Sequence, residues 1–289
     1  MHESALPELV AHKYSVLNPI GGGKFGQVFK GRNVRTGEPV AIKWEPLAQE
    51  FNLLKHESTI LNFLYSKWCR NVPPVYWFGH YGDTHIAMVL PLYDESFADF
   101  VADTELSVTK KADMFLRSAV LILQQIHRHG VVHRDIKPAN WMFRLSKKEG
   151  AKEMVLIDFG LATFVEPDVG YDEAQVKKEH LIGTPKFASW FVHDGQEYTK
   201  RDDLLSVVYM ALWIYYGDRF LESDRECIHD GNTLLPPTHV SSPMNVWLKR
   251  AKSRDRIVQL CANTGNDKLV RVADTLYENH IEYSYCLFS

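Results

Sequence analysis

The chain carries at residues 133–140 the stretch HRDIKPAN, from which the rest of the sequence can be interpreted. The stretch follows Gly130, a predicted helix stop, and two valines, so we expect an ordered loop. Its Asp135, Lys137 and Asn140 place a carboxylate, an ammonium and an amide around one small volume. A carboxylate can orient a hydroxyl and accept its proton, an ammonium can neutralise a phosphoryl group, and an amide oxygen can ligate a metal. The spacing favours phosphoryl transfer.

A second motif is IDFG at residues 157–160, directly after the apolar run 154–156. Asp158 would be a poor choice for stability at the end of a buried strand, because an unpaired buried carboxylate is costly. As a ligand for Mg²⁺ bridging two phosphates, the residue makes chemical sense.

A glycine cluster lies upstream, where residues 20–28 read IGGGKFGQV. Gly21, Gly23 and Gly26 form the pattern G-x-G-x-x-G, in which the backbone can approach a phosphate closely and point N–H groups at it. A glycine-rich hairpin turn is the alternative that the pattern leaves open. A dinucleotide-binding fold would need a helix directly after the loop, whereas a strand-like segment follows here.

The run VAIK at residues 40–43 ends an apolar strand with a lysine. Lys43 could extend to the surface, or it could reach the α- and β-phosphates of a nucleotide. The second interpretation needs an acid that holds the ammonium. Glu57 lies on the apolar face of the next predicted helix, where an unpaired carboxylate would be expensive. Glu50 is the rival acid, and we favour Glu57 because it is set deeper within the helix.

The order of predicted elements indicates an α+β protein. Strands are expected at residues 14–20, 27–33, 40–42, 75–78 and 86–90. Helices are expected at residues 48–65, 110–129, 200–216, 243–261 and 268–279. A strand-rich front lobe and a helix-rich back lobe would meet near residues 90–94, with no Pro/Ser-rich linker between them.

Composition excludes several classes of protein. Of 289 residues, 45% are hydrophobic and 24% charged, which is typical of a soluble globular chain rather than a disordered, collagenous or membrane-spanning one. A net charge of −3 gives no support to binding of nucleic acid or membranes. The N-terminus lacks an apolar signal segment, and the four cysteines lack a C-x-x-C pair. We therefore expect an intracellular protein of the cytoplasm or nucleus, with reduced, buried thiols.

In the order in which they follow one another along the chain, the four motifs resemble those of eukaryotic-type protein kinases over nearly the whole chain. The resemblance implies a bilobal kinase fold over residues 14–289, after an N-terminal extension at 1–13. The N-lobe would cover about 14–90, the hinge 91–94 and the C-lobe 95–289. It also implies ATP and Mg²⁺ as cofactors, protein hydroxyls as substrates and a monomeric state. The lysine two positions after Asp135 resembles the Ser/Thr-specific members.

The resemblance assigns roles to individual residues. The catalytic residues would be Asp135, Lys137, Lys43, Glu57 and Thr184, and the metal ligands Asn140 and Asp158. ATP contacts would come from Ile20, Gly21, Gly22, Gly23, Lys24, Phe25, Gly26, Gln27, Val28, Ala41, Lys43, Leu90, Pro91, Leu92, Tyr93 and Met142. Asp203 would brace the backbone of His133 and Arg134.

One departure narrows the family. Most protein kinases carry A-P-E after the activation loop, but residues 183–190 read GTPKFASW and contain no glutamate. This absence and the tail IEYSY at 281–285 resemble the casein kinase 1 group, which favours acidic or phosphorylated substrates. Arg134 and Lys186 would form its basic pocket. The basic run at 249–256 is interpreted as the solvated face of a helix.

Two alternatives remain. A pseudokinase scaffold would bind nucleotide or partner proteins without transferring phosphate. A small-molecule kinase on a related fold would share the catalytic Asp and Asn, although Lys137 and Gly183-Thr184 fit a protein substrate better.

Overall fold

The structure is a computed structural model that describes residues 9–23, 26–48, 52–93, 95–145, 152–165, 178–221, 239–278 and 285–286. The chain forms two compact units, one made of residues 1–95 and 142–160, the other of residues 96–141 and 161–289. The first unit is strand-rich and the second helical, as predicted. The sequence did not predict that residues 142–160 belong to the first unit. Asn71 holds them there, because its side chain donates to the Met154 carbonyl and its own carbonyl accepts from the Leu156 N–H.

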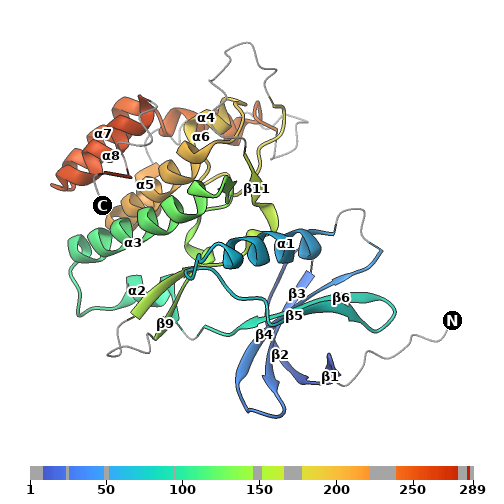
Figure 1. Ribbon diagram of the computed structural model, residues 1–289. Helices are drawn as coiled ribbons and strands as arrows, with labels where there is room; N and C mark the ends of the chain where they lie inside the picture. Colours follow the sequence, from blue (N-terminus) through green and yellow to red (C-terminus); the bar gives the residue numbers. More distant parts are fainter. Residues whose placement is uncertain are drawn as a thin grey trace. The chain divides into compact units, whose positions relative to one another are not determined.

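The first unit contains an antiparallel sheet of six strands (Figure 1). Its strands are β1 (Leu9–Val10), β2 (Tyr14–Gly23), β3 (Gly26–Asn33), β4 (Pro39–Pro46), β5 (Trp77–Tyr81) and β6 (His85–Pro91), in the order β1-β2-β3-β4-β6-β5. The predicted N-terminal extension therefore contributes a strand, since Leu9 pairs with Ser15 and Val10 is completely buried.

Strand β4 presents two different faces. Val40 and Ile42 point into a hydrophobic cluster with Tyr14 and Val89. Because side chains alternate along a strand, Lys43 points to the opposite face. The strand thus uses its apolar positions to fix the sheet and leaves its lysine facing helix α1 (Leu53–Ser66).

Helix α1 begins at Leu53, five residues after the predicted start at Ala48. The chain is still in a turn at Leu47, whose N–H donates to the Thr84 carbonyl. The buried face of the helix consists of Leu54, Glu57, Ser58, Ile60, Leu61 and Leu64. Glu50, the rival partner for Lys43, lies outside the described residues.

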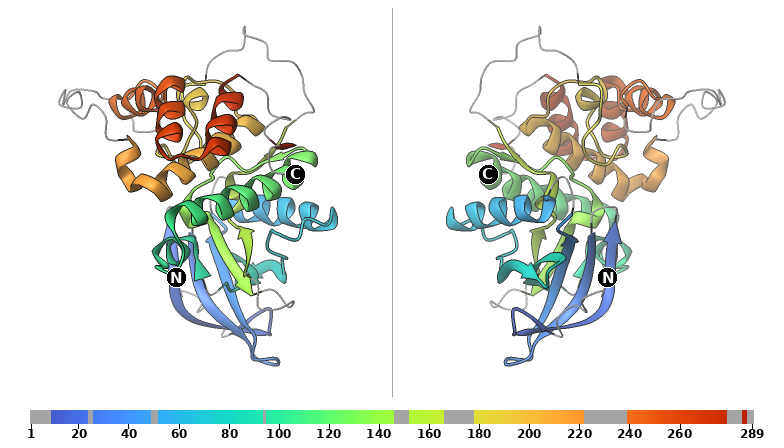
Figure 2. Two further views of the ribbon diagram at one scale, coloured as in Figure 1. Left: turned by 90° about the vertical axis from the view of Figure 1, so that its left-hand side faces the viewer. Right: turned by 90° about the vertical axis from the view of Figure 1, so that its right-hand side faces the viewer.

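The second unit is built from helices α2 (Phe97–Ala102), α3 (Val108–Arg128), α4 (Trp190–His193), α5 (Lys200–Tyr216), α6 (Pro243–Ala251), α7 (Arg254–Asn263) and α8 (Asp267–Tyr277). Helix α5 has the predicted bounds and is buried on nearly all sides, with α3 and α8 packed against it. Figure 2 shows α7 and α8 side by side in red.

The prediction of one helix over residues 243–261 is wrong. Ser253 has the non-helical angles φ −59° and ψ 148° and begins α7, which separates it from α6. No glycine or proline marks the break, so helical periodicity alone could not find it. Lys252 at the break is completely buried, and the prediction that it lies on a solvated face is also wrong.

Three cysteines lie among the described residues, and all are free thiols. Cys69 and Cys261 are buried as expected, whereas Cys286 is exposed, against expectation. Burial raises the pKa of Cys261 to about 12, so its thiol stays protonated at neutral pH. Cys227 is outside the described residues. Within the described part of the chain, every helix is too short or too polar to cross a bilayer.

Candidate active site

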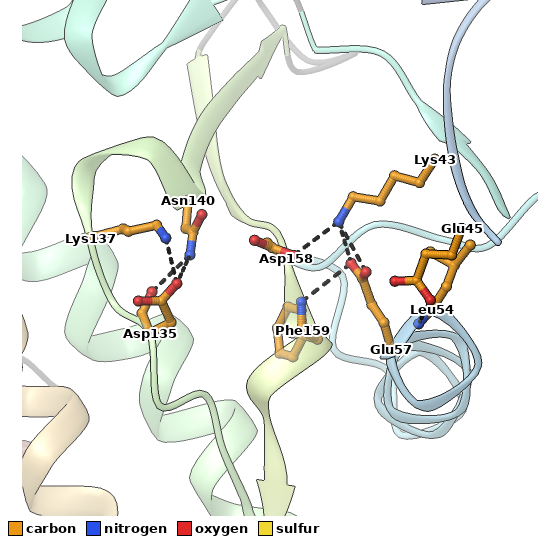
Figure 3. Close-up of polar contacts among 9 residues, drawn as sticks. All are labelled: Lys43, Glu45, Leu54, Glu57, Asp135, Lys137, Asn140, Asp158 and Phe159. Carbon is orange, nitrogen blue, oxygen red and sulfur yellow. Dashed lines mark hydrogen bonds and ion pairs between the residues drawn. The ribbon is translucent and has the colours of Figure 1, made fainter. Parts of the chain in front are cut away.

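Lys43 is held between two carboxylates of the first unit. Its Nζ lies 2.8 Å from Glu57 Oε1, 3.0 Å from Glu57 Oε2 and 3.0 Å from Asp158 Oδ1 (Figure 3). The Glu57 side chain is only 4% exposed, and its Oε1 also accepts from the Phe159 N–H at 3.3 Å. The predicted pair of Lys43 and Glu57 is therefore formed, and the IDFG motif joins it.

The charge of Lys43 follows from these partners. Burial disfavours the ammonium, but the Coulombic attraction and hydrogen bonds of Glu57 and Asp158 outweigh it and raise the pKa of Lys43. The side chain therefore stays cationic at neutral pH. A permanent ammonium within β4 is what binding to a polyphosphate requires.

Glu45 anchors the start of α1 and was missed by the sequence analysis. Its Oε2 accepts a hydrogen bond from the Leu54 N–H at 3.0 Å, one of the N–H groups that a helix N-terminus leaves unpaired (Figure 3). Glu45 stands two residues after Lys43 and so projects from the same face of β4. The sequence did offer one signal for Glu45, which is a second charged residue in an otherwise apolar strand.

Asp158 has a left-handed backbone, with φ +67°. A non-glycine residue in this region costs roughly 1–3 kcal/mol and is found mainly at functional sites. The side chain is 45% exposed while its Oδ1 contacts Lys43. The carboxylate thus pairs with the lysine and still faces solvent.

The glycine cluster forms a β-hairpin, in which Gly21 pairs with Val28 and Gly23 with Gly26. No helix follows it, which agrees with the rejection of a dinucleotide-binding fold. Gly26 is needed for packing, because a Cβ there would lie 2.5 Å from the Trp44 carbonyl oxygen. At Gly21 the nearest atom would be 3.9 Å away, so the fold itself does not require glycine there. Lys24 and Phe25 lie outside the described residues.

Two of the predicted adenine contacts, Ala41 and Leu90, lie on neighbouring strands, and Met142 lies on a strand of another sheet. Ala41 pairs with Leu90 across β4 and β6, and Leu90 is buried. Leu92 and Tyr93 follow the end of β6, and Met142 lies on β9 (Trp141–Leu145). Their contact with a nucleotide stays a prediction.

Asp135 is the centre of a hydrogen-bond cluster in the second unit. Lys137 Nζ donates to its Oδ2 at 2.5 Å, and Asn140 Nδ2 donates to its main-chain carbonyl at 2.8 Å (Figure 3). The N–H and hydroxyl of Thr184 donate to its Oδ1 at 2.9 and 2.7 Å. Asp135 is only 7% exposed, so these contacts fix the direction of its carboxylate. The structure thus brings together four residues predicted from two separate motifs.

Asp203 on α5 braces the loop that carries Asp135. Its carboxylate accepts from the N–H groups of His133 at 2.7 Å and Arg134 at 3.0 Å, as predicted. Arg134 needs support, because its φ of +68° is left-handed. His127 and Tyr198 also bond the carboxylate, at 3.0 and 2.9 Å, and neither contact was predicted from the sequence.

The charge of Asp203 is stabilised by the same contacts. Burial opposes ionisation, but hydrogen bonds and Coulombic attraction, led by those from His127, lower the pKa of Asp203. The brace therefore remains a carboxylate well below neutral pH.

Comparison with known proteins decides the family. Residues 14–263 match the family described as protein kinase domain. The chain belongs to the protein kinase family. Casein kinase I homolog 1 of Schizosaccharomyces pombe is 31% identical to the kinase over 212 residues, which cover 72% of this chain and 47% of the relative. The chain thus spans about half the length of this curated relative.

The two residues of the predicted anion pocket are engaged within the kinase. Arg134 Nε donates to the Leu161 carbonyl at 2.6 Å. Lys186 forms an ion pair with Asp218, whose Oδ1 also accepts from the Trp213 indole N–H at 2.8 Å. Sequence analysis missed Asp218, which supplies an internal anion to Lys186.

Gly183 is required by the backbone of the kinase. Its φ is +89°, and a Cβ would lie 2.3 Å from the Arg134 carbonyl oxygen. We expect Gly183→Ala to lose about 2–4 kcal/mol of unfolding free energy, because it adds a backbone clash to a strained conformation. Gly265→Ala is the control, since Gly265 has φ +72° but no atom within 4 Å of the added Cβ. Denaturant titration of both variants measures the difference, and equal losses would contradict the clash.

Proposed function

We propose that the kinase is an active enzyme that transfers the γ-phosphoryl group of Mg-ATP to Ser/Thr hydroxyls of proteins. The arrangement around Asp135 is the observation that supports this most directly. Its carboxylate is oriented by Thr184 and lies against the ammonium of Lys137. A base with a fixed direction and a cation beside it are the two groups that phosphoryl transfer to a hydroxyl needs.

Each residue then has a chemical task. Asp135 orients the substrate hydroxyl and accepts its proton, and Lys137 stabilises the charge that develops on the transferred group. Lys43, held by Glu57, binds the α- and β-phosphates. Gly21 leaves room for a phosphate above the hairpin, because the fold itself does not need glycine at this position.

Asn140 and Asp158 would hold Mg²⁺. Mg²⁺ takes one or two protein oxygens and completes its shell with water and phosphate, so one oxygen from each of these two side chains would suffice. The hydrogen bonds from Asn140 to Asp135 use the amide nitrogen, so its oxygen is the ligand atom. When bound, the ion would neutralise charge on the phosphates.

The pseudokinase alternative is disfavoured by the same contacts. A scaffold has no need for a buried lysine–glutamate pair or for two strained residues at the catalytic motifs. The small-molecule kinase alternative has no observation in its favour. An intracellular location, a monomeric state and the absence of nucleic-acid or membrane partners stay predictions.

We further propose casein kinase 1-type specificity for acidic or phospho-primed substrates, with Lys186 as the anion-binding residue. Asp218 competes for the same ammonium. We therefore expect the preference for primed over basic peptides to fall about tenfold in Lys186→Ala, and to rise by a similar factor in Asp218→Asn, the worth of one charge-assisted hydrogen bond. Ratios of kcat/KM over a panel of primed, acidic and basic peptides provide the measurement.

The control variant is Lys249→Ala, which removes another lysine that is paired with an aspartate, Asp194. It should leave the peptide preference unchanged. A wild-type preference for basic peptides would overturn the proposed specificity but leave the phosphoryl-transfer function standing.

A further inference from the structure

Lys252 occupies an unusual position for a lysine. It follows the last turn of α6 and is completely buried. Its Nζ donates to the carbonyl oxygens of Pro185 at 2.8 Å and Ala188 at 2.6 Å, and lies 3.1 Å from His193 Nε2. The ring of Tyr209 faces the same nitrogen, with 5.1 Å to its centroid. None of these partners is a carboxylate.

Such a lysine is costly to the fold. Burial penalises the ammonium and lowers the pKa of Lys252 well below its ordinary value. Burial and the neighbouring Lys252 also lower the pKa of His193, so that ring is neutral. A methionine or leucine would fill this position at less expense, since a buried amine has to recover its lost hydration through hydrogen bonds. The two carbonyl contacts are the features that a hydrocarbon side chain could not provide.

Those carbonyls belong to the segment that orients Asp135. Residues 184–188 form a turn in which the N–H groups of Phe187 and Ala188 donate to the Thr184 carbonyl at 2.9 and 3.0 Å. Thr184 in turn donates twice to Asp135. Lys252 therefore holds the turn at two points, at Pro185 next to Thr184 and at Ala188 at the far end of the turn.

The turn also lacks the acid that most protein kinases have here. Residues 183–190 contain no acidic side chain, so the segment offers no carboxylate of its own for a cation to hold, and its one ion pair described is that of Lys186 with Asp218, whose side chain is 68% exposed. Among the described residues, two other side chains contact the carbonyls of this turn. Ser206 on α5 donates to the Phe187 carbonyl at 2.7 Å, and His193 Nε2 lies 3.0 Å from the Pro185 carbonyl. The segment is thus held through main-chain carbonyls from α5 and from the end of α6.

We propose that Lys252 is a positioning residue that fixes the turn 184–188 and, through Thr184, the direction of the Asp135 carboxylate. The proposal rests on the proposed phosphoryl-transfer function. It predicts that loss of the amine loosens the turn and slows phosphoryl transfer, while nucleotide binding, which uses Lys43 in the first unit, is unchanged.

The test compares Lys252→Met with Lys249→Met. Methionine keeps much of the apolar volume and removes the donors, and Lys249 lies three residues earlier, in the last turn of α6, but pairs with Asp194. We expect kcat per nucleotide-binding site to fall about tenfold or more in Lys252→Met, with the KM for ATP unchanged and Lys249→Met near wild type. Wild-type kcat in a folded Lys252→Met protein would overturn the proposal, as would equal losses in the two variants.

Two further measurements keep the test decisive. Ser206→Ala removes only the one hydroxyl that α5 donates to the same turn, so the variant should fold and should show a smaller loss of kcat with an unchanged KM for ATP. Hydrogen exchange of residues 183–188 should be about tenfold faster in Lys252→Met, with residues of α3 unchanged as a reference. This exchange readout does not need activity. An inactive wild-type protein would defeat the proposed function, whereas unchanged exchange would defeat the positioning role.

Discussion

Asp135→Asn is expected to lower kcat by about 10²–10⁴-fold, the usual contribution of a positioned general base. Asparagine is nearly isosteric, and its amide oxygen can still accept the two hydrogen bonds from Thr184 while the bond from Lys137 is lost, so the loop should keep its conformation. The substrate hydroxyl would lose its proton acceptor. Steady-state phosphorylation of a peptide measures kcat, and titration calorimetry with Mg-ATP should give an unchanged Kd.

Asp274→Asn is the matched control, because Asp274 is an exposed carboxylate that pairs with Arg254 on the surface. It should have wild-type kcat. Unchanged phosphorylation in Asp135→Asn would remove the base from the proposed mechanism. A wild-type protein that binds ATP and phosphorylates neither proteins nor small molecules would favour the pseudokinase scaffold instead.

Lys43→Met is expected to reduce kcat/KM for ATP by about 10²–10³-fold, since it removes a preorganised cation from the phosphates. It should also destabilise the protein by roughly 3 kcal/mol, because the nearly inaccessible carboxylate of Glu57 would lose its partner. ATP-dependent kinetics and thermal unfolding measure the two effects independently.

The stability loss in Lys43→Met should depend on pH. Burial is the main factor that raises the pKa of Glu57, and Lys43 opposes it. Without Lys43, the pKa of Glu57 in the folded state lies above its pKa in the unfolded state. As the pH falls, the folded variant therefore binds a proton at Glu57 before the unfolded chain does, and this binding stabilises the native state. The difference in Tm between Lys43→Met and wild type should therefore become smaller as the pH is lowered from about 8 to about 5.

A double variant supplies the control for this pH dependence. Lys43→Met combined with Glu57→Gln has no buried carboxylate at this position, so its Tm should show a weaker trend with pH and should exceed that of Lys43→Met at neutral pH. A difference that stays constant with pH in the single variant would mean that Glu57 is not the group responsible.

Local sequence signals account for the parts of the structure that were predicted well. Helix α5 has the predicted bounds because both ends carry strong signals: Asp202 accepts from the Thr199 N–H at 2.7 Å, and Gly217 ends the helix with φ +59°. The Asp135 cluster was predictable because its residues come from short motifs in which spacing determines chemistry. The partnership of Lys43 and Glu57 followed from the cost of burying either charge alone.

The features that the sequence did not predict depend on contacts that only the fold creates. Helix α1 starts five residues later than predicted, at a point where Glu45 of strand β4 accepts a hydrogen bond from the Leu54 N–H. Lys252 looked like one member of a basic surface run, and only the fold brings the carbonyls of Pro185 and Ala188 to it. The anion that faces Lys186 comes from Asp218, 32 residues away. No periodicity or motif reports such pairings.

The Glu45 contact with Leu54 has a consequence for how the first unit can respond to ligands. Lys43 and Glu45 project from the same face of one strand, one toward Glu57 within α1 and the other toward the beginning of that helix. Strand β4 therefore contacts helix α1 at two points, through an ion pair and through a hydrogen bond to the backbone. A compound that swings α1 outward has to break both contacts, and the backbone bond to Glu45 alone is worth about 1.5–3 kcal/mol. Compounds that leave the helix in place avoid that cost, which favours them as inhibitors of this kinase.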